Sequence, residues 1–305
     1  MSTLPLVGRD EDLAVIGAAW RRLVVEPERA RIVVLTGEPG AGKSRLAAEA
    51  VDGLAPRPGR VLHGQARTHS PAPYDWMASA LSGHDLSGVP VPADALAWLT
   101  QRPEAPPRRF APQTLLRAAV DTVRSVLGDE PGVLVVEDLH DLDPASLDLV
   151  SELAAAARLP ALLLVTSRAP AQAPKLVARV LARLSGTPRG TRRHLAPLSA
   201  TQVASVLAGH DTDPAAAYRS TGGNPYRLAE LLATGPAMDG GARLTARERE
   251  VIRCLAAGMT NQQTASELGI SIRTVTVHVS NLLRKTGAAS RTEAALWAVR
   301  HGMSV

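Results

Sequence analysis

The chain has 305 residues, of which 45% are hydrophobic and 21% charged, a composition that excludes wholesale disorder and leaves room for two domains. The formal net charge of +5 lies mostly at one end, because residues 244–305 carry eight Arg and Lys against four Asp and Glu. The single cysteine, Cys254, excludes a disulfide framework and a cysteine-rich zinc site, and it indicates a reducing, cytoplasmic environment.

The first residues contain no basic segment followed by an apolar stretch of signal-peptide length, and nowhere do 18 apolar residues run together. We therefore expect neither export nor contact with a membrane. A small basic module attached to a nearly neutral body favours a nucleic-acid partner, although a solvated basic helical face has the same composition.

The first two thirds of the chain alternate apolar runs with helical patterns. Residues 31–54 predict a strand, a glycine-rich turn and a helix, and further apolar runs follow at 60–66, within 132–150 and at 161–168. Continuous apolar strands alternating with helices are typical of a parallel sheet covered on both faces, so the predicted fold class is α/β, with its core at 1–170. Residues 85–112 are rich in proline and predict an irregular excursion. Helical segments near 173–185, 199–208, 213–220 and 226–234 predict a helical lid at 171–234.

A phosphate-binding loop is predicted between the first strand and the first long helix. The spacing G-x-x-x-x-G-K-S is met by Gly37, Glu38, Pro39, Gly40, Ala41, Gly42, Lys43 and Ser44. Glycines let successive backbone N–H groups point at phosphate oxygens, Lys43 supplies charge to the β and γ phosphates, and Ser44 offers its hydroxyl to Mg²⁺. Arginine outnumbers lysine 31 to 3, which makes a lysine at this position informative. The alternative is a glycine turn with no ligand.

Two acids and one arginine follow neighbouring strands. Glu137 and Asp138 end the run at 132–138, where one would hold Mg²⁺ through its water shell and the other would orient an attacking water. Arg168 ends the next strand, at the edge where ligands lie in such sheets, and could contact a γ-phosphate. Lys43, Glu137, Asp138 and Arg168 are thus the candidate catalytic residues. Asp143 has the features of a helix N-cap before Pro144, and His140 those of a loop or packing residue.

These segments together resemble the STAND class of AAA-type P-loop NTPases, as found in large ATP-binding LuxR-type regulators. The resemblance rests on "LVGRDEDLAVI", "VLVVEDLHDLDPASLDLV", "LLLVTSR" and "TGGNPYRLAELL", in matching order over most of residues 4–234. It implies ATP or ADP as ligand, with slow hydrolysis. It also places the Val7-Gly8-Arg9 segment near the nucleotide and the Gly223-Asn224-Pro225 segment in the lid. The nucleotide-binding set is therefore the loop from Gly37 to Ser44 with Gly8, Arg9, Arg45, Asn224 and Pro225.

The basic module at 244–305 predicts four short helices. Thr245 with Glu248, Thr260 with Gln263, and Ser290 with Glu293 have capping-box spacing, and glycines at 258, 269, 287 and 302 stand where helices should end. Helices at about 261–268 and 272–286 are separated by three residues, which is helix-turn-helix spacing. Cys254 shares a helical face with Val251 and Leu255, which predicts core packing.

The helix at 272–286 has two predicted faces. Its buried stripe comprises Ile272, Val275, Val279, Leu282 and Leu283. Short side chains point the other way, and we expect Val277 to touch a thymine methyl and Ser280 or Asn281 to hydrogen-bond to bases. The DNA-binding set is Arg273, Thr274, Thr276, Val277, Ser280, Asn281, Arg284 and Lys285, with the charged members placed for phosphates. The alternative is an interaction bundle with a solvated face.

This module is similar to the LuxR/GerE-type DNA-binding domain through "LTAREREV", "TNQQTASELGIS", "RTVTVHVSNLLRKTG" and "SRTEA". The resemblance implies that 272–286 enters the major groove of promoter DNA, that 291–301 pairs two subunits as a homodimer, and that RNA polymerase is a partner. Thr276 stands where many members carry a lysine.

Residues 235–243 are a predicted linker, on the order of 15 Å if flexible. We therefore expect a transcription regulator in which the STAND-type nucleotide switch controls the helix-turn-helix. The alternatives are a DNA-stimulated ATPase of the AAA+ loader kind, a constitutive DNA binder with a vestigial nucleotide site and, more distantly, a small-molecule kinase.

Overall fold

The computed structural model describes residues 4–66, 72–102, 110–210, 212–234, 244–286, 288 and 290–300. The chain forms two compact units, residues 1–229 and 230–305. The predicted linker at 235–243 and the last residues, 301–305, lie outside the described residues.

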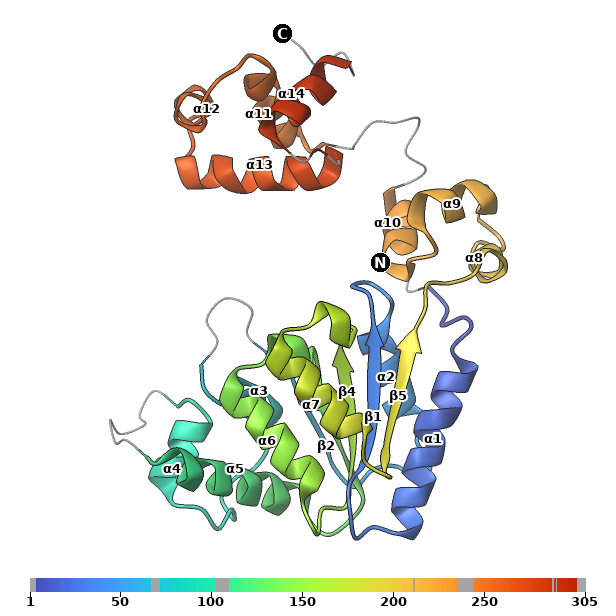
Figure 1. The fold of residues 1–305 in the computed structure, drawn as a ribbon, viewed down its shortest axis with the longest axis vertical. Helices are drawn as coiled ribbons and strands as arrows, with labels where there is room; N and C mark the ends of the chain where they lie inside the picture. Colours follow the sequence, from blue (N-terminus) through green and yellow to red (C-terminus); the bar gives the residue numbers. More distant parts are fainter. Residues whose placement is uncertain are drawn as a thin grey trace. The chain divides into compact units, whose positions relative to one another are not determined.

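The larger unit contains a parallel five-stranded sheet, which confirms the predicted fold class (Figure 1). Its strands lie in the order β2-β3-β4-β1-β5. They span Val61–Gly64 (β2), Gly132–Val136 (β3), Ala161–Ser167 (β4), Arg31–Gly37 (β1) and Gly190–Leu195 (β5). Every side chain of β3 and β4 is buried, because helices cover both faces, and this explains the continuous apolar runs.

Alternate residues of the strands face two separate helical layers. One layer holds α1 (Asp10–Val25) and α2 (Lys43–Asp52), which pack on Val33, Leu35 and Leu164. The other layer packs on the opposite face of the sheet. It comprises α3 (Asp75–Ala80), α4 (Ala93–Leu99), α5 (Pro112–Leu127), α6 (Pro144–Ala155) and α7 (Lys175–Ser185).

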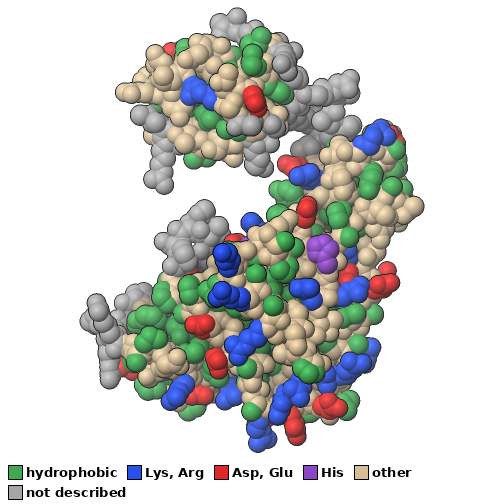
Figure 2. Space-filling model, viewed as in Figure 1, with side chains coloured by type: hydrophobic (Ala, Val, Ile, Leu, Met, Phe, Trp, Pro, Cys, Tyr) green, Lys and Arg blue, Asp and Glu red, His purple; other side chains and the backbone are tan. Residues whose placement is uncertain are grey.

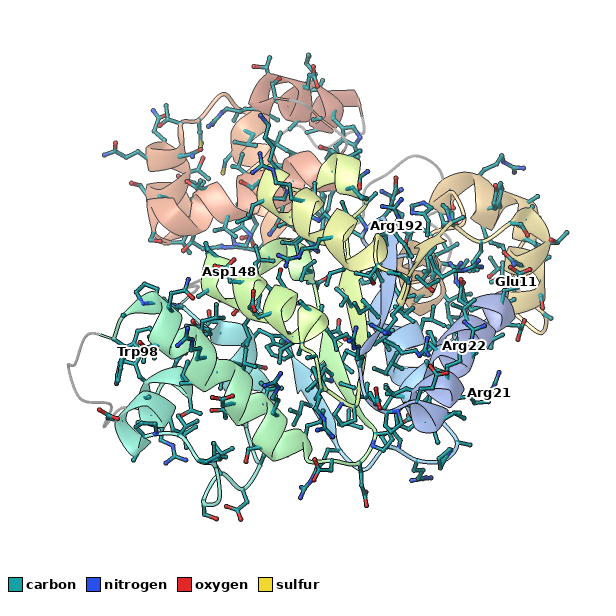
Figure 3. The ribbon with its side chains drawn as sticks, turned by 60° about the horizontal axis from the view of Figure 1, so that its bottom comes forward. Glu11, Arg21, Arg22, Trp98, Asp148 and Arg192 are labelled. Atoms are coloured by element: carbon teal, nitrogen blue, oxygen red, sulfur yellow. The ribbon has the colours of Figure 1, made fainter. Side chains whose placement is uncertain are left out.

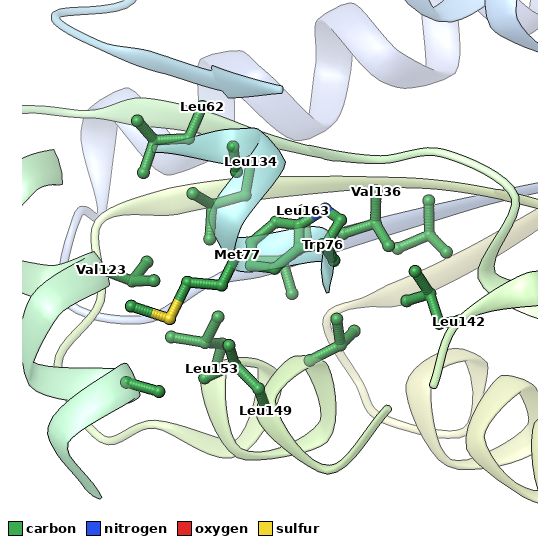
Figure 4. Close-up of a cluster of buried hydrophobic side chains, with 14 of the residues drawn as sticks. Leu62, Trp76, Met77, Val123, Leu134, Val136, Leu142, Leu149, Leu153 and Leu163 are labelled. Carbon is green, nitrogen blue, oxygen red and sulfur yellow. The ribbon is translucent and has the colours of Figure 1, made fainter. Parts of the chain in front are cut away.

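The second layer is centred on α3. Trp76 and Met77 are fully buried and lie among leucines of the sheet and of α6 (Figure 4). The Trp76 indole Nε1 donates to the carbonyl of Val135 at 3.1 Å, so the ring is also fixed to β3 by a hydrogen bond. This contact anchors the insertion between β2 and β3 to the sheet.

Two predictions about the larger unit are wrong in detail. The excursion at 85–112 contains α4, whose Ala95 and Leu99 are buried; the helix has only seven residues, too few to show clear periodicity. The lid predicted from residue 171 begins too early, because α7 packs on the sheet and β5 pairs with β1. β5 is an edge strand in which only Leu195 is buried, so it lacks the apolar run that identifies the inner strands. The lid helices are α8 (Ala200–Val206), α9 (Pro214–Thr221) and α10 (Pro225–Thr234).

Besides the end of α10, the described part of the smaller unit consists of α11 (Ala246–Ala256), α12 (Asn261–Leu268), α13 (Ile272–Thr286) and α14 (Arg291–Arg300). Thr245 and Thr260 form the predicted capping boxes with Glu248 and Gln263. Gly269 ends α12 in a left-handed conformation. Cys254 is buried beside Val251 and Leu255, as predicted, and burial raises the pKa of its thiol. Gly287 and Gly302 are not among the described residues.

No helix within the described ranges combines the length and the apolar character that a membrane crossing requires. Over the face of the larger unit seen in Figure 2, Lys and Arg side chains are interspersed with Asp and Glu, in keeping with its near-neutral composition.

Asp143 joins α3 and α6, two helices of the second layer. Its carboxylate accepts from the Ser146 backbone N–H at 2.9 Å and so caps α6, as predicted. It also accepts from the backbone N–H groups of Tyr74 and Asp75, at 3.1 and 3.3 Å, at the start of α3. The side chain is buried.

We expect Asp143→Ala to lower the free energy of unfolding of the larger unit by about 2 to 3 kcal/mol, because it removes a cap and leaves buried N–H donors without an acceptor. Asp213→Ala is the matched control: Asp213 also caps a helix before a proline, but its two hydrogen bonds are exposed. That change should cost about 1 kcal/mol. Denaturant unfolding measures both, and equal losses would contradict the structural role of the α3 contacts.

Candidate functional site

The predicted phosphate loop lies between β1 and α2, at the carboxyl edge of the sheet. Gly40 and Gly42 have φ of +79° and +89°, a conformation that side chains with a Cβ rarely adopt. Lys43 is 8% exposed, and its Nζ donates to the carbonyls of Gly37 and Glu38 at 3.1 and 3.0 Å. Burial lowers the pKa of Lys43, while Asp138 acts in the opposite direction. The loop therefore surrounds a partly desolvated ammonium group.

Ser44 and Glu137 come from different elements and meet. The Ser44 hydroxyl donates to Oε2 of Glu137, which is buried at the end of β3. The other carboxylate oxygen, Oε1, lies 3.3 Å from Nε2 of His63 on β2. The structure thus brings together the hydroxyl and the first of the two acids that the sequence singles out as metal ligands.

Asp138, His140 and Arg168 lie beside the loop. Asp138 adopts a left-handed conformation, and its backbone N–H donates to Thr166 at 2.9 Å, which fixes the turn after β3. The His140 imidazole is buried between Asp138 and Asp141, at 3.9 and 3.6 Å. Burial lowers the pKa of His140, against the effect of the two carboxylates. His140 is therefore a packing residue, as predicted, but it packs at the site itself.

A cavity of about 660 Å³ opens over the loop. Several predicted site residues line it: Arg9, Pro39, Gly40, Ala41, Gly42, Lys43, Ser44, Arg45, Asp138, Arg168 and Pro225. Its remaining walls are mainly apolar, from Leu4, Pro5, Leu6, Val7, Leu198, Val206, Tyr226 and Ala229, together with His140 and Asp141. Gly8, Gly37, Glu38, Glu137 and Asn224 are not among its lining residues.

The lid contacts the loop directly. The Asn224 side-chain amide donates to the carbonyl of Pro39 at 2.9 Å, and the Tyr226 backbone N–H donates to the carbonyl of Gly40 at 3.2 Å. Arg9 acts from the other side, where its Nη2 donates to the carbonyls of Ala41 and Ala196, at 3.3 and 2.7 Å. The residues that the resemblance assigns to the nucleotide therefore hold the loop backbone.

A second candidate surface lies on α13 in the smaller unit. Val275 and Leu282 are buried, whereas Val277 is 54% exposed. Thr274, Thr276 and Ser280 are also exposed, and Asn281 is half-buried. The outward face is therefore made of short, uncharged side chains, as the sequence predicts. The side chains of Ile272, Arg273 and Arg284 lie outside the described part of this helix.

Lys285 has a partner that the sequence does not reveal. Its Nζ lies 2.7 Å from Oε2 of Glu248, the buried capping residue of α11. The pKa of Glu248 is lowered: burial acts against this, but the hydrogen bonds from Lys285 and Thr245 outweigh it. A phosphate contact by Lys285 would compete with this ion pair.

Comparison with known proteins identifies the larger unit. Residues 5–165, more than half of the chain, match the family model described as the AAA ATPase domain. The chain belongs to the AAA ATPase domain family. A second model, for bacterial regulatory proteins of the luxR family, matches residues 242–298, so the smaller unit is a LuxR-type helix-turn-helix domain.

Curated relatives resemble a short part of this AAA protein. A transcriptional regulatory protein of Bacillus subtilis, YhcZ, described as uncharacterized, is 47% identical over 62 residues, which are 20% of this chain and 29% of the relative. The response regulator VraR of Staphylococcus aureus is 43% identical over 60 residues, with the same coverage. The match to this chain thus covers less than a third of the length of each relative.

Solved structures also resemble this chain, and the first of the following two shares its fold. The ORC1 protein of Aeropyrum pernix, solved in complex with DNA, is 14% identical with a TM-score of 0.53, over 93% of this chain and 84% of that one. A STAND protein with a tetratricopeptide repeat sensor from Pyrococcus horikoshii is 15% identical with a TM-score of 0.47, over 84% of this chain and 36% of that one.

Sequence reasoning missed the apolar wall of the cavity. Leu4, Leu6, Leu198 and Ala229 come from segments far apart in the chain, and no motif assigns these four residues to the site. Tyr226, which also lines the cavity, is 66% exposed. It directly follows Pro225, which the resemblance assigns to the site, and an aromatic residue at that place is the one feature of the sequence that indicates this wall.

A substitution at Gly40 tests whether the contact between the lid and the phosphate loop contributes to nucleotide binding. A Cβ at Gly40 would lie 2.6 Å from Oδ1 of Asn224 and 2.7 Å from Cβ of Tyr226. We expect Gly40→Ala to push the lid away and weaken nucleotide binding by about tenfold or more. Gly83→Ala is the control, because Gly83 has φ +83° with open space around it, so it suffers the backbone strain alone. Titration with a fluorescent nucleotide measures both; wild-type affinity in Gly40→Ala would contradict the expectation.

Proposed function

We propose that this chain is an ATP-dependent transcription regulator, in which the nucleotide state of the AAA domain controls DNA binding by the LuxR-type domain. The observation that carries the proposal is a single cavity bounded by the phosphate loop, the strand-end residues Asp138 and Arg168, and the lid, in the same chain as a helix-turn-helix domain.

The cavity suits a nucleoside triphosphate. Lys43 and the loop amides are placed for phosphates, and the apolar walls formed by Leu6, Leu198 and Tyr226 suit a purine base. Ser44, Glu137 and Asp138 offer hydroxyl and carboxylate oxygens, the donors that Mg²⁺ prefers, and the Ser44–Glu137 hydrogen bond shows that two of these donors reach one point. We assign Mg²⁺ to these residues and ATP or ADP to the cavity.

Hydrolysis in this proposal is slow and serves regulation. One of the two acids after β3, Glu137 or Asp138, would orient a water for attack while the other holds the metal, and Arg168, which lines the cavity, would neutralise charge at the γ-phosphate. Ser44 and His63 engage both oxygens of Glu137, so this carboxylate must give up one of these partners before it takes either role.

The smaller unit binds the major groove of promoter DNA through α13. Val277, Ser280 and Asn281 contact base edges, whereas Arg273, Thr274, Arg284 and Lys285 contact phosphates, with Thr276 between the two groups. Leu296 and Val299 on α14 are 51% and 52% exposed, and these apolar side chains support pairing of two copies on a two-fold site. RNA polymerase is the further partner that regulation of transcription requires.

Lys43→Ala tests the nucleotide half of the proposal and its coupling to DNA. We expect calorimetry with Mg²⁺ to show ATP affinity reduced at least about 100-fold, because the phosphates lose their cation. When wild-type protein selects DNA fragments from a genomic pool, the set of bound fragments should differ between selections with and without ATP. With Lys43→Ala, the two sets should be the same. Coupling on the order of 5- to 150-fold in DNA affinity is expected.

Lys175→Ala is the matched control, because Lys175 is exposed on α7 and does not line the cavity. Identical DNA affinity in the apo, ADP and ATP states would contradict the coupling. Steady-state turnover stimulated many-fold by DNA would instead favour an ATPase of the loader kind.

Two substitutions on α13 separate base contacts from phosphate contacts. We expect Asn281→Ala to reduce the preference for target over non-specific DNA by about 1 to 3 kcal/mol. The slope of the logarithm of the binding constant against the logarithm of the salt concentration should stay unchanged. Lys285→Ala should weaken binding to all sequences alike and lower the slope by about one. Titrations at several salt concentrations measure both, with circular dichroism as a check on folding. An unchanged slope in Lys285→Ala would assign Lys285 to the pair with Glu248 alone.

A further inference from the structure

We propose that Asp12 is a positioning residue for nucleotide binding: together with Arg193 it holds the Arg9 guanidinium against the backbone of the phosphate loop. This inference rests on the proposed function, because the loop is taken as the phosphate site. It adds two residues, Asp12 and Arg193, that no motif of the chain assigns to that site.

Asp12 is a buried carboxylate between two guanidinium groups. It lies in the first turn of α1 and is 5% exposed. Oδ1 accepts from Nε of Arg193 on β5 at 2.7 Å, and Oδ2 lies 4.0 Å from Nη1 of Arg9. The carboxylate therefore links the edge strand of the sheet to the residue that precedes α1.

Arg9 in turn holds two backbone segments. Its Nη2 donates to the carbonyl of Ala41, inside the phosphate loop, and to that of Ala196, directly after β5 where the chain leaves the sheet for the lid. One guanidinium thus joins α1, the loop and the start of the lid.

The contact with Ala41 has a consequence for the loop. In a trans peptide the C=O and the following N–H point in opposite directions. Because Arg9 holds the carbonyl of Ala41, the N–H of Gly42 is directed away from Arg9. Gly42 has φ +89° and lines the cavity, and at such a glycine the peptide before it turns freely unless it is held. Asn224 and Tyr226 hold the two preceding carbonyls, so three consecutive peptides of the loop are fixed from outside.

The buried charge of Arg9 explains why the Asp12 carboxylate is needed to keep Arg9 in place. Arg9 is 8% exposed, and burial lowers the pKa of its guanidinium, whereas Asp12 raises it. Asp12 also raises the pKa of Arg193 through their hydrogen bond. Without the carboxylate, Arg9 would be a buried cation with no acid to compensate it, and it would move toward water and release the loop.

Glu11 provides a matched control. It also contacts Arg193, at 3.2 Å from Nη2, but its side chain is 89% exposed on α1 (Figure 3). Within the described residues, Glu11 contacts neither Arg9 nor the phosphate loop. Removing its charge perturbs the same arginine and leaves the Asp12–Arg9 pair in place.

The test compares Asp12→Asn, Asp12→Glu and Glu11→Gln in the full chain. We expect Asp12→Asn to weaken the binding of both ATP and ADP by about tenfold or more, as measured by calorimetry with Mg²⁺. Asp12→Glu, which keeps the charge, should restore a large part of the affinity, and Glu11→Gln should stay within about twofold of wild type. Affinity in Asp12→Asn equal to wild type, with a lower melting temperature, would assign Asp12 to the fold alone and overturn the proposal.

Amide hydrogen exchange of residues 38–44 without nucleotide keeps this inference separate from the proposed function. Asp12→Asn should speed exchange in this segment, and Glu11→Gln should not. If wild type binds no nucleotide, the proposed function fails, while the exchange data still decide whether Asp12 orders the loop. Exchange in Asp12→Asn equal to that of wild type would overturn the inference in either case.

Discussion

The site depends on one constraint: a glycine-containing loop must keep its peptides in a fixed orientation before a phosphate reaches it. Gly40 and Gly42 permit the tight curl, but the same freedom lets the chain leave it. The structure meets the constraint with donors from outside the loop, supplied by Asn224, Tyr226 and Arg9. Lys43 contributes from inside, through the carbonyls of Gly37 and Glu38. Orientation is therefore provided by the lid and by the N-terminal segment, both remote from the loop in sequence.

The parallel sheet determines where these groups can meet. All five strands run in one direction, so β1, β3 and β4 deliver Lys43, Glu137 and Arg168 to the same edge. The two buried layers keep that edge in place, and the insertion between β2 and β3 belongs to one of them through Trp76 and Asp143. Residues far from the cavity, such as Trp76 and Asp143, thus support its geometry.

The parts that the sequence predicts are those specified locally. The phosphate loop, the acids after β3 and the capping boxes at Thr245 and Thr260 each depend on residues within a few positions of one another. β5 escaped prediction because an edge strand carrying Arg192 and Arg193 has no apolar run. The apolar wall of the cavity and the partner of Lys285 escaped it because they join distant segments, and no spacing rule specifies such contacts.

The helix α10 gives the proposed coupling a covalent route. Its first turn contacts the loop, since Asn224 caps it and bonds Pro39 while Tyr226 bonds Gly40. Its last residue, Thr234, is followed by the segment that leads to Leu244 and the LuxR-type domain, and the division between the two compact units falls within it, after Ala229. A ten-residue helix is about 15 Å long, and its backbone hydrogen bonds connect its first turn to its last. A change at the phosphate loop that shifts the first turn of α10 must therefore also shift the point from which the helix-turn-helix domain is tethered.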